Sequence, residues 1–238
     1  MTGAEIRKDQ RWYGRRTGRK LTDARQRLMA DCLPALRLGA TDDLNDLPAL
    51  FGGRVRDIWM EIGFGAGEHL AGQAAAHPEV GFIGCEPYIN GVASFLAMHQ
   101  AKGLENVRLF DDDVRLLLPR LAAASLGRLY ILFSDPWPKA RHHRRRVTAS
   151  ENLAAFARVL RPGGELRFAT DQTEFASWTL ERVLREARFD WPARRPQDWA
   201  LRPEDWIETR YERKARAKGY EPVYLNFRRS DESPSKPA

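Results

Sequence analysis

EIGFGAGEHL, residues 61–70, joins a strand-like run at 57–62 to a helical pattern that begins at Glu68. The three glycines within it let the backbone turn sharply and approach a ligand closely. A strand, a glycine-rich turn and a helix in this order are typical of the first unit of an α/β sheet that binds a cofactor at the turn. The stretch therefore predicts both a fold class and the place of a cofactor site.

Strand-like and helical patterns alternate downstream of this turn. Runs of apolar and β-branched residues indicate strands at 57–62, 80–85, 107–110, 129–133, 165–169 and 223–227, and helical patterns occupy 68–76, 89–102, 149–160 and 174–187. Strands that are apolar almost throughout are expected to be covered on both faces. The alternation predicts an α/β fold with a doubly wound, mostly parallel sheet.

Local signals mark the ends of three of these helices. Gly103 follows the second helix as a C-cap, and the string RPGG at 161–164 stops the third. Thr173 directly precedes the fourth helix, where its hydroxyl is placed to cap the N-terminus.

The 238 residues suffice for one sizeable domain with a short extension. We expect a basic N-terminal extension over 1–50, one domain over 51–229, and a disordered tail over 230–238. No stretch approaches the roughly 20 uncharged apolar residues that cross a bilayer, and the N-terminus lacks the apolar run of a secretory signal. Cys32 and Cys85 have no metal-ligand spacing, so we expect reduced thiols, no metal and a cytoplasmic protein.

The net charge of +7 is unevenly distributed along the chain. Residues 1–56 carry 12 Lys/Arg and 7 Asp/Glu, residues 57–138 carry 5 and 10, and residues 139–238 carry 22 and 15. A polyanion would be attracted by the two basic flanks and repelled by the acidic middle. This pattern fits an enzyme with a cationic cofactor and a nucleic-acid substrate.

Two acidic residues distinguish the glycine-rich turn from the similar turn of dinucleotide-binding enzymes. The third glycine of the dinucleotide fingerprint would fall at Glu68. Glu61 places a carboxylate directly before the turn, where it would repel a pyrophosphate and attract the ammonium and sulfonium of S-adenosylmethionine. The turn, with Gly63, Gly65 and Gly67, therefore favours S-adenosylmethionine.

Further acidic residues end the second and third predicted strands. Glu86 is placed to accept hydrogen bonds from both ribose hydroxyls of a cofactor, as such residues do in dinucleotide enzymes too. The run of three aspartates at 111–113 follows the third strand, and one of them could accept the adenine amino group. Capping of a turn is the alternative role for each of the three.

The string FSDPWPKARHHRRR, residues 133–146, leaves the fourth strand at its carboxyl end, where ligands bind in doubly wound folds. Its prolines stiffen the turn and would hold Asp135 and Trp137 still beside the cofactor. Five basic residues follow between 139 and 146, which a purely structural turn does not require. Trp137 either stacks on a base or packs in the core. The string is therefore the candidate catalytic segment.

These motifs resemble the bacterial tRNA (guanine-N7-)-methyltransferase family. The resemblance covers residues 55–228 and rests on EIGFGAGEHL (61–70), FSDPWPKARHHRRR (133–146), RPGGELRFATD (161–171) and TRYERKARAKG (209–219). It implies a class I, Rossmann-like methyltransferase fold with a seven-stranded sheet. It also implies methyl transfer from S-adenosylmethionine to guanine N7 in the variable loop of tRNA, which gives 7-methylguanosine.

The turn and the resemblance together define the candidate site. The predicted catalytic residue is Asp135, and the predicted cofactor-binding residues are Glu61, Gly63, Gly65, Gly67, Glu86, Asp112, Asp113 and Asp135, with Asp112 and Asp113 as alternatives for the adenine. The resemblance implies that Lys139, Asp171, Thr209, Arg210, Tyr211 and Glu212 meet the tRNA. Thr209 and Glu212 also fit a capping box at a helix N-terminus. Monomer and homodimer both remain open.

Guanine N7 carries a lone pair and no proton, so the reaction needs positioning and electrostatics and no general base. We expect Asp135 to orient the guanine by accepting hydrogen bonds from its Watson–Crick edge and to stabilise the growing positive charge. The basic residues at 139–146, with Arg15, Arg16, Arg19 and Lys20, are expected to contact phosphates.

Three other functions are consistent with parts of the sequence. A methyltransferase acting on an exocyclic amine usually has two prolines before the aromatic residue of this turn, whereas here Trp137 lies between two prolines. A dinucleotide-dependent oxidoreductase is disfavoured by Glu61 and Glu68. An RNA-binding protein without catalysis would have no need of Glu61, Glu86 and Asp135.

Overall fold

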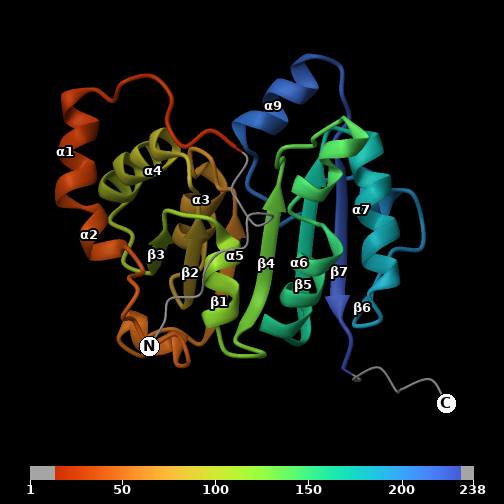
Figure 1. Cartoon of the computed structure of the whole chain (residues 1–238), viewed down its shortest axis with the longest axis horizontal. Coiled ribbons are helices and arrows are strands. Elements are labelled where there is room, and N and C mark those ends of the chain that lie inside the picture. Colours follow the sequence, from red (N-terminus) through yellow and green to blue (C-terminus); the bar gives the residue numbers. More distant parts are fainter. Residues whose placement is uncertain (1–13, 232–238) are drawn as a thin grey trace.

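The computed structural model describes residues 14–231. A seven-stranded sheet with the order β3-β2-β1-β4-β5-β7-β6 crosses the molecule (Figure 1). Its strands are β1 (Asp57–Ile62), β2 (Val80–Cys85), β3 (Val107–Phe110), β4 (Leu126–Leu132), β5 (Leu160–Thr170), β6 (Phe189–Asp190) and β7 (Val223–Arg229). The first five run parallel, and β7 is antiparallel to both of its neighbours. The predicted doubly wound, mostly parallel sheet is confirmed.

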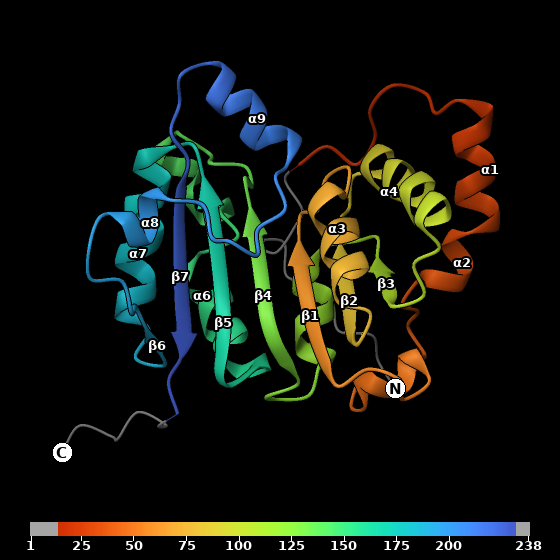
Figure 2. The ribbon, with the colours of Figure 1, turned by 180° about the vertical axis from the view of Figure 1, so that it is seen from behind.

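Helices cover both faces of the sheet (Figures 1 and 2). The α-helices are α1 (Asp23–Asp31), α2 (Leu33–Leu36), α3 (Glu68–Ala76), α4 (Ile89–Lys102), α5 (Val114–Leu117), α6 (Ser150–Val159), α7 (Thr173–Arg185), α8 (Gln197–Ala200) and α9 (Arg210–Ala217), and the 3-10 helices are η2 (Leu47–Phe51), η3 (Leu118–Arg120) and η4 (Ala140–Arg145). α5, α6 and α7 lie on one face, and α3 and α4 lie on the other.

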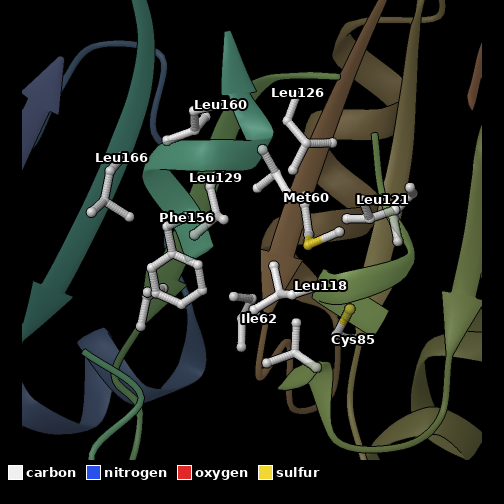
Figure 3. Packing of buried hydrophobic residues seen from close by; sticks show 14 of the residues in the cluster. Met60, Ile62, Cys85, Leu118, Leu121, Leu126, Leu129, Phe156, Leu160 and Leu166 are labelled. Atoms are coloured by element: carbon white, nitrogen blue, oxygen red, sulfur yellow. The ribbon is translucent and has the colours of Figure 1, made fainter. Parts of the chain in front are cut away.

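Alternation along β1 shows how the sheet serves two cores. Met60 and Ile62 pack with α5 and α6 on one face (Figure 3), whereas Trp59 packs with α3 on the other. Side chains of a strand alternate between faces, so Glu61 lies on the same face as Trp59. This placement directs the carboxylate of Glu61 toward α3.

Several predicted element ends are confirmed, and one is wrong. The predicted helices at 68–76 and 89–102 match α3 and α4, and Gly103 caps α4 with a φ of +62°. The cap of α7 was expected at Thr173, but the structure places it at Gln172, whose backbone N–H donates to the hydroxyl of Thr170 at 3.2 Å. Thr173 itself lies inside the first helical turn.

β4 and β5 begin earlier than predicted, at Leu126 and Leu160, β7 extends to Arg229, and β6 was not predicted. The helix α6 ends at Val159 as the string at 161–164 predicts, but this string continues into β5, because Leu160 pairs with Leu126 on the neighbouring strand. The register of this pair shifts between Leu126 and Arg128, so the extra residues form an irregular start to β5. β6 has two residues and therefore carries no periodic pattern that a sequence could display.

The described part of the N-terminal extension packs against the domain. Leu33 and Leu36 of α2 are buried beside the face that carries α3 and α4. Arg37 bridges to Leu109 of β3 as an added parallel partner. The expected tail at 230–238 and the start of the extension lie mostly outside the described residues.

Candidate cofactor and substrate site

A cavity of about 490 Å³ opens at the carboxyl ends of β1 and β4. The strand order reverses between these two strands, and this switch point is where open α/β sheets bind their ligands. Its walls bring together Gly63, Gly65, Glu86, Asp112, Asp113 and Asp135, which come from four separate loops. Six of the predicted cofactor-binding residues therefore meet in one cavity of the size that cofactors occupy.

The glycine-rich turn needs glycine for conformation and for space. Gly63, Gly65 and Gly67 have φ values of +75°, +58° and +85°, which L-residues adopt rarely. A Cβ at Gly67 would lie 2.5 Å from the ring of Phe95, and a Cβ at Gly91 of α4 would lie 2.3 Å from the carbonyl oxygen of Gly65. The turn is thus pressed against α4, and Gly63 and Gly65 face the cavity.

Glu86 is a buried carboxylate at the cavity wall. Its oxygens accept hydrogen bonds from the backbone N–H of Gly65 at 2.7 Å and of Tyr88 at 2.9 Å. Burial raises the pKa of Glu86 to about 7, although these two hydrogen bonds act in the opposite direction. The remaining lone pairs of the carboxylate can accept from a ligand, so Glu86 ties the turn to the second strand and offers acceptors to the cavity.

The three adjacent aspartates have separate partners, which removes most of their mutual repulsion. Asp111 accepts a hydrogen bond from Arg37 at 2.8 Å, and Asp112 forms an ion pair with Arg16. The pairing of Asp112 with Arg16 brings the N-terminal segment to the edge of the cavity, which no motif in the sequence indicates.

Asp113 has a capping role in the structure. It accepts from the backbone N–H of Arg115 at 3.0 Å as the N-cap of α5. Both of its oxygens also accept from the guanidinium of Arg115, and it is 5% exposed. Asp112 is more exposed than Asp113 and lines the same cavity. Asp112 is therefore the better placed of the two for a ligand.

Asp135 lies on a turn whose backbone is strained. Phe133 and Trp137 both have positive φ values, 52° and 44°, and they flank Asp135. Such conformations persist only where the surrounding structure enforces them, and they gather at functional sites. The side chain of Asp135 reaches solvent inside the cavity, yet burial by the walls raises its pKa above the usual value. The turn thus presents to the cavity an exposed carboxylate whose pKa is raised by the nearby walls.

Arg146 holds this turn through a hydrogen bond from within the protein. Its side chain is fully buried, and its Nε donates to the carbonyl oxygen of Pro136 at 2.7 Å. The guanidinium also pairs with Glu174 at 2.5 Å and lies 4.9 Å from the ring of Phe175 and 4.7 Å from that of Trp178. The expectation that Arg146 contacts phosphate is therefore wrong, because its charge is enclosed and committed within the protein.

Trp137 lines the cavity and does not join the core. The guanidinium of Arg145 lies 5.0 Å from the centre of its ring, and His142 meets it edge-on at 6.0 Å. Arg145 also lines the cavity, whereas Lys139 and Arg144 are exposed beyond it. The part of this segment that follows Asp135 thus contains one buried arginine, one arginine at the cavity and several exposed cations.

Glu61 has an internal partner that the sequence did not predict. It is 3% exposed, lies outside the cavity lining, and accepts a hydrogen bond from Nδ1 of His69 at 2.8 Å. His69 follows the glycine-rich turn on α3 and is 1% exposed. The carboxylate of Glu61 therefore stands behind the turn, not in the cavity wall.

The predicted substrate-binding residues on α9 have different environments. The hydroxyl of Thr209 accepts from the backbone N–H of Glu212 at 3.1 Å and caps the helix. The side chain of Glu212 is fully buried and accepts from Trp206 at 3.0 Å and from Tyr224 at 2.6 Å, so the reciprocal half of the capping box is missing. A direct contact of Glu212 with tRNA is incompatible with this burial.

Tyr211 is exposed and lines the cavity, and the preceding Arg210 lines a second, neighbouring groove. Asp171 follows β5 at the same edge of the sheet, but neither it nor Lys139 lines the cavity. Of the six predicted substrate residues, Tyr211 alone lines the cavity, and Arg210 lines the neighbouring groove.

A basic groove adjoins the cavity. Arg15, Arg19 and Arg25 line it together with Arg210, and Arg15 and Tyr88 belong to both depressions. The N-terminal segment and α9 approach each other above the carboxyl ends of the parallel strands (Figures 1 and 2). Among the described residues, Arg15, Arg19 and Arg25 have no acidic partner. We call this surface the basic groove.

Asn90 at the start of α4 holds the N-terminal segment in place. Its side chain accepts from the backbone N–H of Gly18 at 2.8 Å and donates to the carbonyl oxygen of Arg19 at 2.7 Å. The backbone N–H of Ile89 donates to the carbonyl oxygen of Arg16 at 2.9 Å. The segment 15–20, which we call the N-terminal strap, is therefore bonded to the start of α4 and carries Arg15 and Arg19, whereas Arg25 lies on α1 and Arg210 on α9.

Residues 14–231 contain neither a membrane-spanning helix nor a cluster of metal-binding side chains. None of the helices there is long and apolar enough to cross a membrane. No group of three or more His, Cys, Asp or Glu side chains in the same range is arranged to hold a metal ion.

The fold and the cavity at its switch point define a methyltransferase of the class I kind. A family model with the description "Putative methyltransferase" matches residues 56–225. The 16S rRNA (adenine(1408)-N(1))-methyltransferase from Catenulisporales acidiphilia has the same fold, with a TM-score of 0.56 and 19% identity over 83% of this chain and 98% of that chain. The 16S rRNA methyltransferase KamB gives a TM-score of 0.54 at 20% identity over 76% and 93%.

Curated relatives are far more similar in sequence. The tRNA (guanine-N(7)-)-methyltransferase of Rhodospirillum rubrum is 50% identical over 93% of this chain and 88% of the relative. The protein of the same name from a Jannaschia species is 45% identical over 92% and 94%. This chain belongs to the tRNA (guanine-N(7)-)-methyltransferase family.

Proposed function

We propose that this protein transfers a methyl group from S-adenosylmethionine to N7 of a guanine in tRNA, giving 7-methylguanosine. The observation that carries the proposal is the identity of 45–50% with relatives of that name over more than nine-tenths of the chain. The acidic cavity beside a basic groove supports it independently. The target is a guanine of the variable loop, and the enzyme acts in the cytoplasm, where tRNA is found.

The cavity fits S-adenosylmethionine, which supplies a methyl group on a positively charged sulfur. Glu86 accepts hydrogen bonds from the ribose hydroxyls, and Asp112 accepts a hydrogen bond from the adenine amino group. Asp112 and Asp113 are paired with arginines, so Glu86 and Asp135 contribute most of the negative charge in the wall that favours a cationic ligand. The bacterial 16S rRNA methyltransferase has also been solved with its cosubstrate, in a variant that shares this fold at a TM-score of 0.57.

Asp135 orients the guanine and needs to remove no proton. Its carboxylate accepts hydrogen bonds from the donors of the Watson–Crick edge, and this places N7 in line with the methyl group. Guanine becomes cationic as the bond forms, and a carboxylate held beside it stabilises that charge. The strained turn and Arg146 hold the carboxylate in position before the substrate arrives.

The basic groove binds the phosphates of tRNA next to the cavity. Arg15 and Arg19 present positive charge to solvent on a segment that is bonded to the start of α4, and Arg25 of α1 adds a third exposed charge. Such contacts fix the register of a nucleic acid and contribute affinity without reading sequence. Tyr211 lies between the groove and Asp135 with an exposed ring, where an extruded base can stack.

The test is a methylation assay that identifies the product. Unmodified tRNA is incubated with the protein and methyl-labelled S-adenosylmethionine, and the digested nucleosides are identified by mass spectrometry. We expect 7-methylguanosine, and we expect its loss in Asp135→Asn but not in the control Asp190→Asn, which lies on the edge strand β6. A different methylated nucleoside would transfer the protein to the exocyclic-amine class. An unmethylated tRNA would overturn the proposal.

A further inference from the structure

Three buried polar side chains form a chain behind the glycine-rich turn. Glu61 on β1 and His69 and Gln73 on α3 are between 1% and 3% exposed. The ring of His69 also contacts Tyr130 at 4.7 Å and Trp206 at 5.4 Å between ring centres. Buried polar groups are costly unless they are hydrogen-bonded, so the direction of each bond in this chain is a structural constraint.

The orientation of the Gln73 amide follows from its contact with the backbone. Its Nε2 lies 2.6 Å from the carbonyl oxygen of Asp205. A carbonyl oxygen only accepts, so the nitrogen of the amide and not its oxygen faces Asp205. The same Nε2 has a second hydrogen and lies 3.4 Å from Nε2 of His69. Gln73 therefore presents a donor to the imidazole.

The Gln73 donor selects the tautomer of His69. Nε2 of the ring must accept, so in the neutral imidazole the proton is on Nδ1. Nδ1 lies 2.8 Å from Oε2 of Glu61 and donates to it. Each hydrogen bond in the chain thus points one way, from Gln73 to His69 and from His69 to Glu61.

We propose that His69 is a positioning residue, which Gln73 holds as the neutral Nδ1–H tautomer so that it orients Glu61 without neutralising the charge of the carboxylate. An imidazolium beside Glu61 would cancel the negative charge next to the cavity, whereas a neutral donor fixes the carboxylate and preserves it. Glu61 directly precedes Ile62 and Gly63, which line the cavity. The charge of Glu61 then acts on a cationic cofactor from behind the turn. This last step rests on the proposed function.

The chain also joins the cofactor turn to the segment before α9. Asp205, which accepts from Gln73, precedes Trp206, and Trp206 donates to the buried Glu212. The helix α3 is therefore connected to α9 through the hydrogen bond of Gln73 to Asp205, the ring contact of His69 with Trp206 and the hydrogen bond of Trp206 to Glu212.

The first experiment determines the tautomer directly. The protein contains five histidines, so nitrogen-15 labelling of histidine gives a spectrum in which His69 can be assigned from the signals that His69→Asn removes. At pH 8 we expect the ring of His69 to be the neutral Nδ1–H tautomer. An Nε2–H tautomer or a doubly protonated ring at that pH would overturn the proposal. This measurement requires neither cofactor nor tRNA.

The second experiment measures binding of S-adenosylmethionine by calorimetry. We expect His69→Leu to weaken binding about tenfold, the effect of losing one hydrogen bond to a charged group. His69→Asn retains an amide donor near the place of Nδ1, and we expect it to restore affinity to within about threefold of the wild type. The turnover number at saturating cofactor should change less than the affinity in both variants.

His77→Asn serves as the matched control, because His77 ends the same helix and packs on Trp59 without contacting Glu61. We expect wild-type affinity in that variant. Equal weakening by His69→Leu and His69→Asn would show that packing and not the donor matters, and this would refute the proposal. If the wild type itself fails to bind S-adenosylmethionine, the proposed function fails while the tautomer result stands separately.

Discussion

The cavity and the basic groove lie side by side, but their charged side chains differ in burial and in how firmly they are held. In the cavity, Glu86 is buried and held by backbone N–H groups, and Asp135 stands on a braced turn. In the groove, Arg15, Arg19 and Arg25 are exposed and lack acidic partners among the described residues, whereas Arg210 pairs with Glu68. Fixed, poorly solvated charges recognise a ligand by geometry, whereas solvated charges on long side chains attract a polyanion with little selectivity. The comparison separates recognition of a cofactor from attraction of a nucleic acid.

The largest effect should come from Arg146, which is a cation of the scaffold although its neighbours in sequence are surface cations. Arg146→Ala should lower the free energy of unfolding by about 3 kcal/mol, because it removes a buried side chain that bonds Pro136 and packs on two aromatic rings. Thermal and urea unfolding measure this. Arg144→Ala, at the exposed position two residues earlier, should stay within about 0.5 kcal/mol. Equal effects would erase the distinction between the two classes of arginine.

The second prediction concerns the groove. Replacing Arg15, Arg19 and Arg25 together with Gln should reduce the slope of log affinity for tRNA against log salt by about 3, roughly one for each lost phosphate contact. Binding of S-adenosylmethionine should change less than binding of tRNA, because only Arg15 of the three also lines the cavity. Filter binding at several salt concentrations measures the slope, and Arg54→Gln at the opposite end of β1 is the control. An unaltered slope would exclude the groove from the tRNA surface.

The third prediction uses the raised pKa of Glu86, which is about 7. Between its ordinary value and about 7 the folded protein holds a proton that the unfolded chain releases, so the stability of the free protein should fall as pH rises through this window and level off above it. Ribose hydroxyls donate to the ionised form, so affinity for S-adenosylmethionine should be about tenfold weaker at pH 6 than well above pH 7. Glu86→Gln should abolish both dependences. Titration calorimetry at several pH values measures the affinity, and an affinity of the wild type that does not change with pH would contradict this prediction.

The smallest effect is expected at the cap of α9. Thr209→Ala removes the hydroxyl that accepts from Glu212 and should cost about 1 kcal/mol of stability. Thr22 caps α1 with a longer hydrogen bond of 3.4 Å, so Thr22→Ala should cost less. Urea unfolding of both variants ranks the two caps, and the reverse order would contradict this reading of the geometry.

Most of the sheet could be predicted, because covered strands and amphipathic helices have periods that a sequence displays. The prediction was least accurate where a tertiary contact overrides a local signal. The hydroxyl of Thr170 moves the cap of α7 to Gln172, and pairing with Leu126 turns the string after α6 into the start of β5. Asp135 was predicted because it lies on a turn of unusual composition, and Glu86 because it is an acidic residue at the end of a predicted strand. The residues that hold these side chains and turns in place, such as Arg146 below the turn of Asp135, were not predicted.

The amino-acid sequence alone predicted the strand, glycine-rich turn and helix over 57–76, the aspartate on its proline-flanked turn, and the uneven charge of the chain. Each of these is a local pattern, since it depends on spacing along the backbone. Only the tertiary structure decided that Arg146 is interior, that Glu61 faces His69 and that the N-terminal strap pairs with Asp112. These contacts join different elements of the fold, so no local pattern in the sequence reveals them. The burial of a charged side chain and the partner it meets, and not its residue type alone, decide what it does.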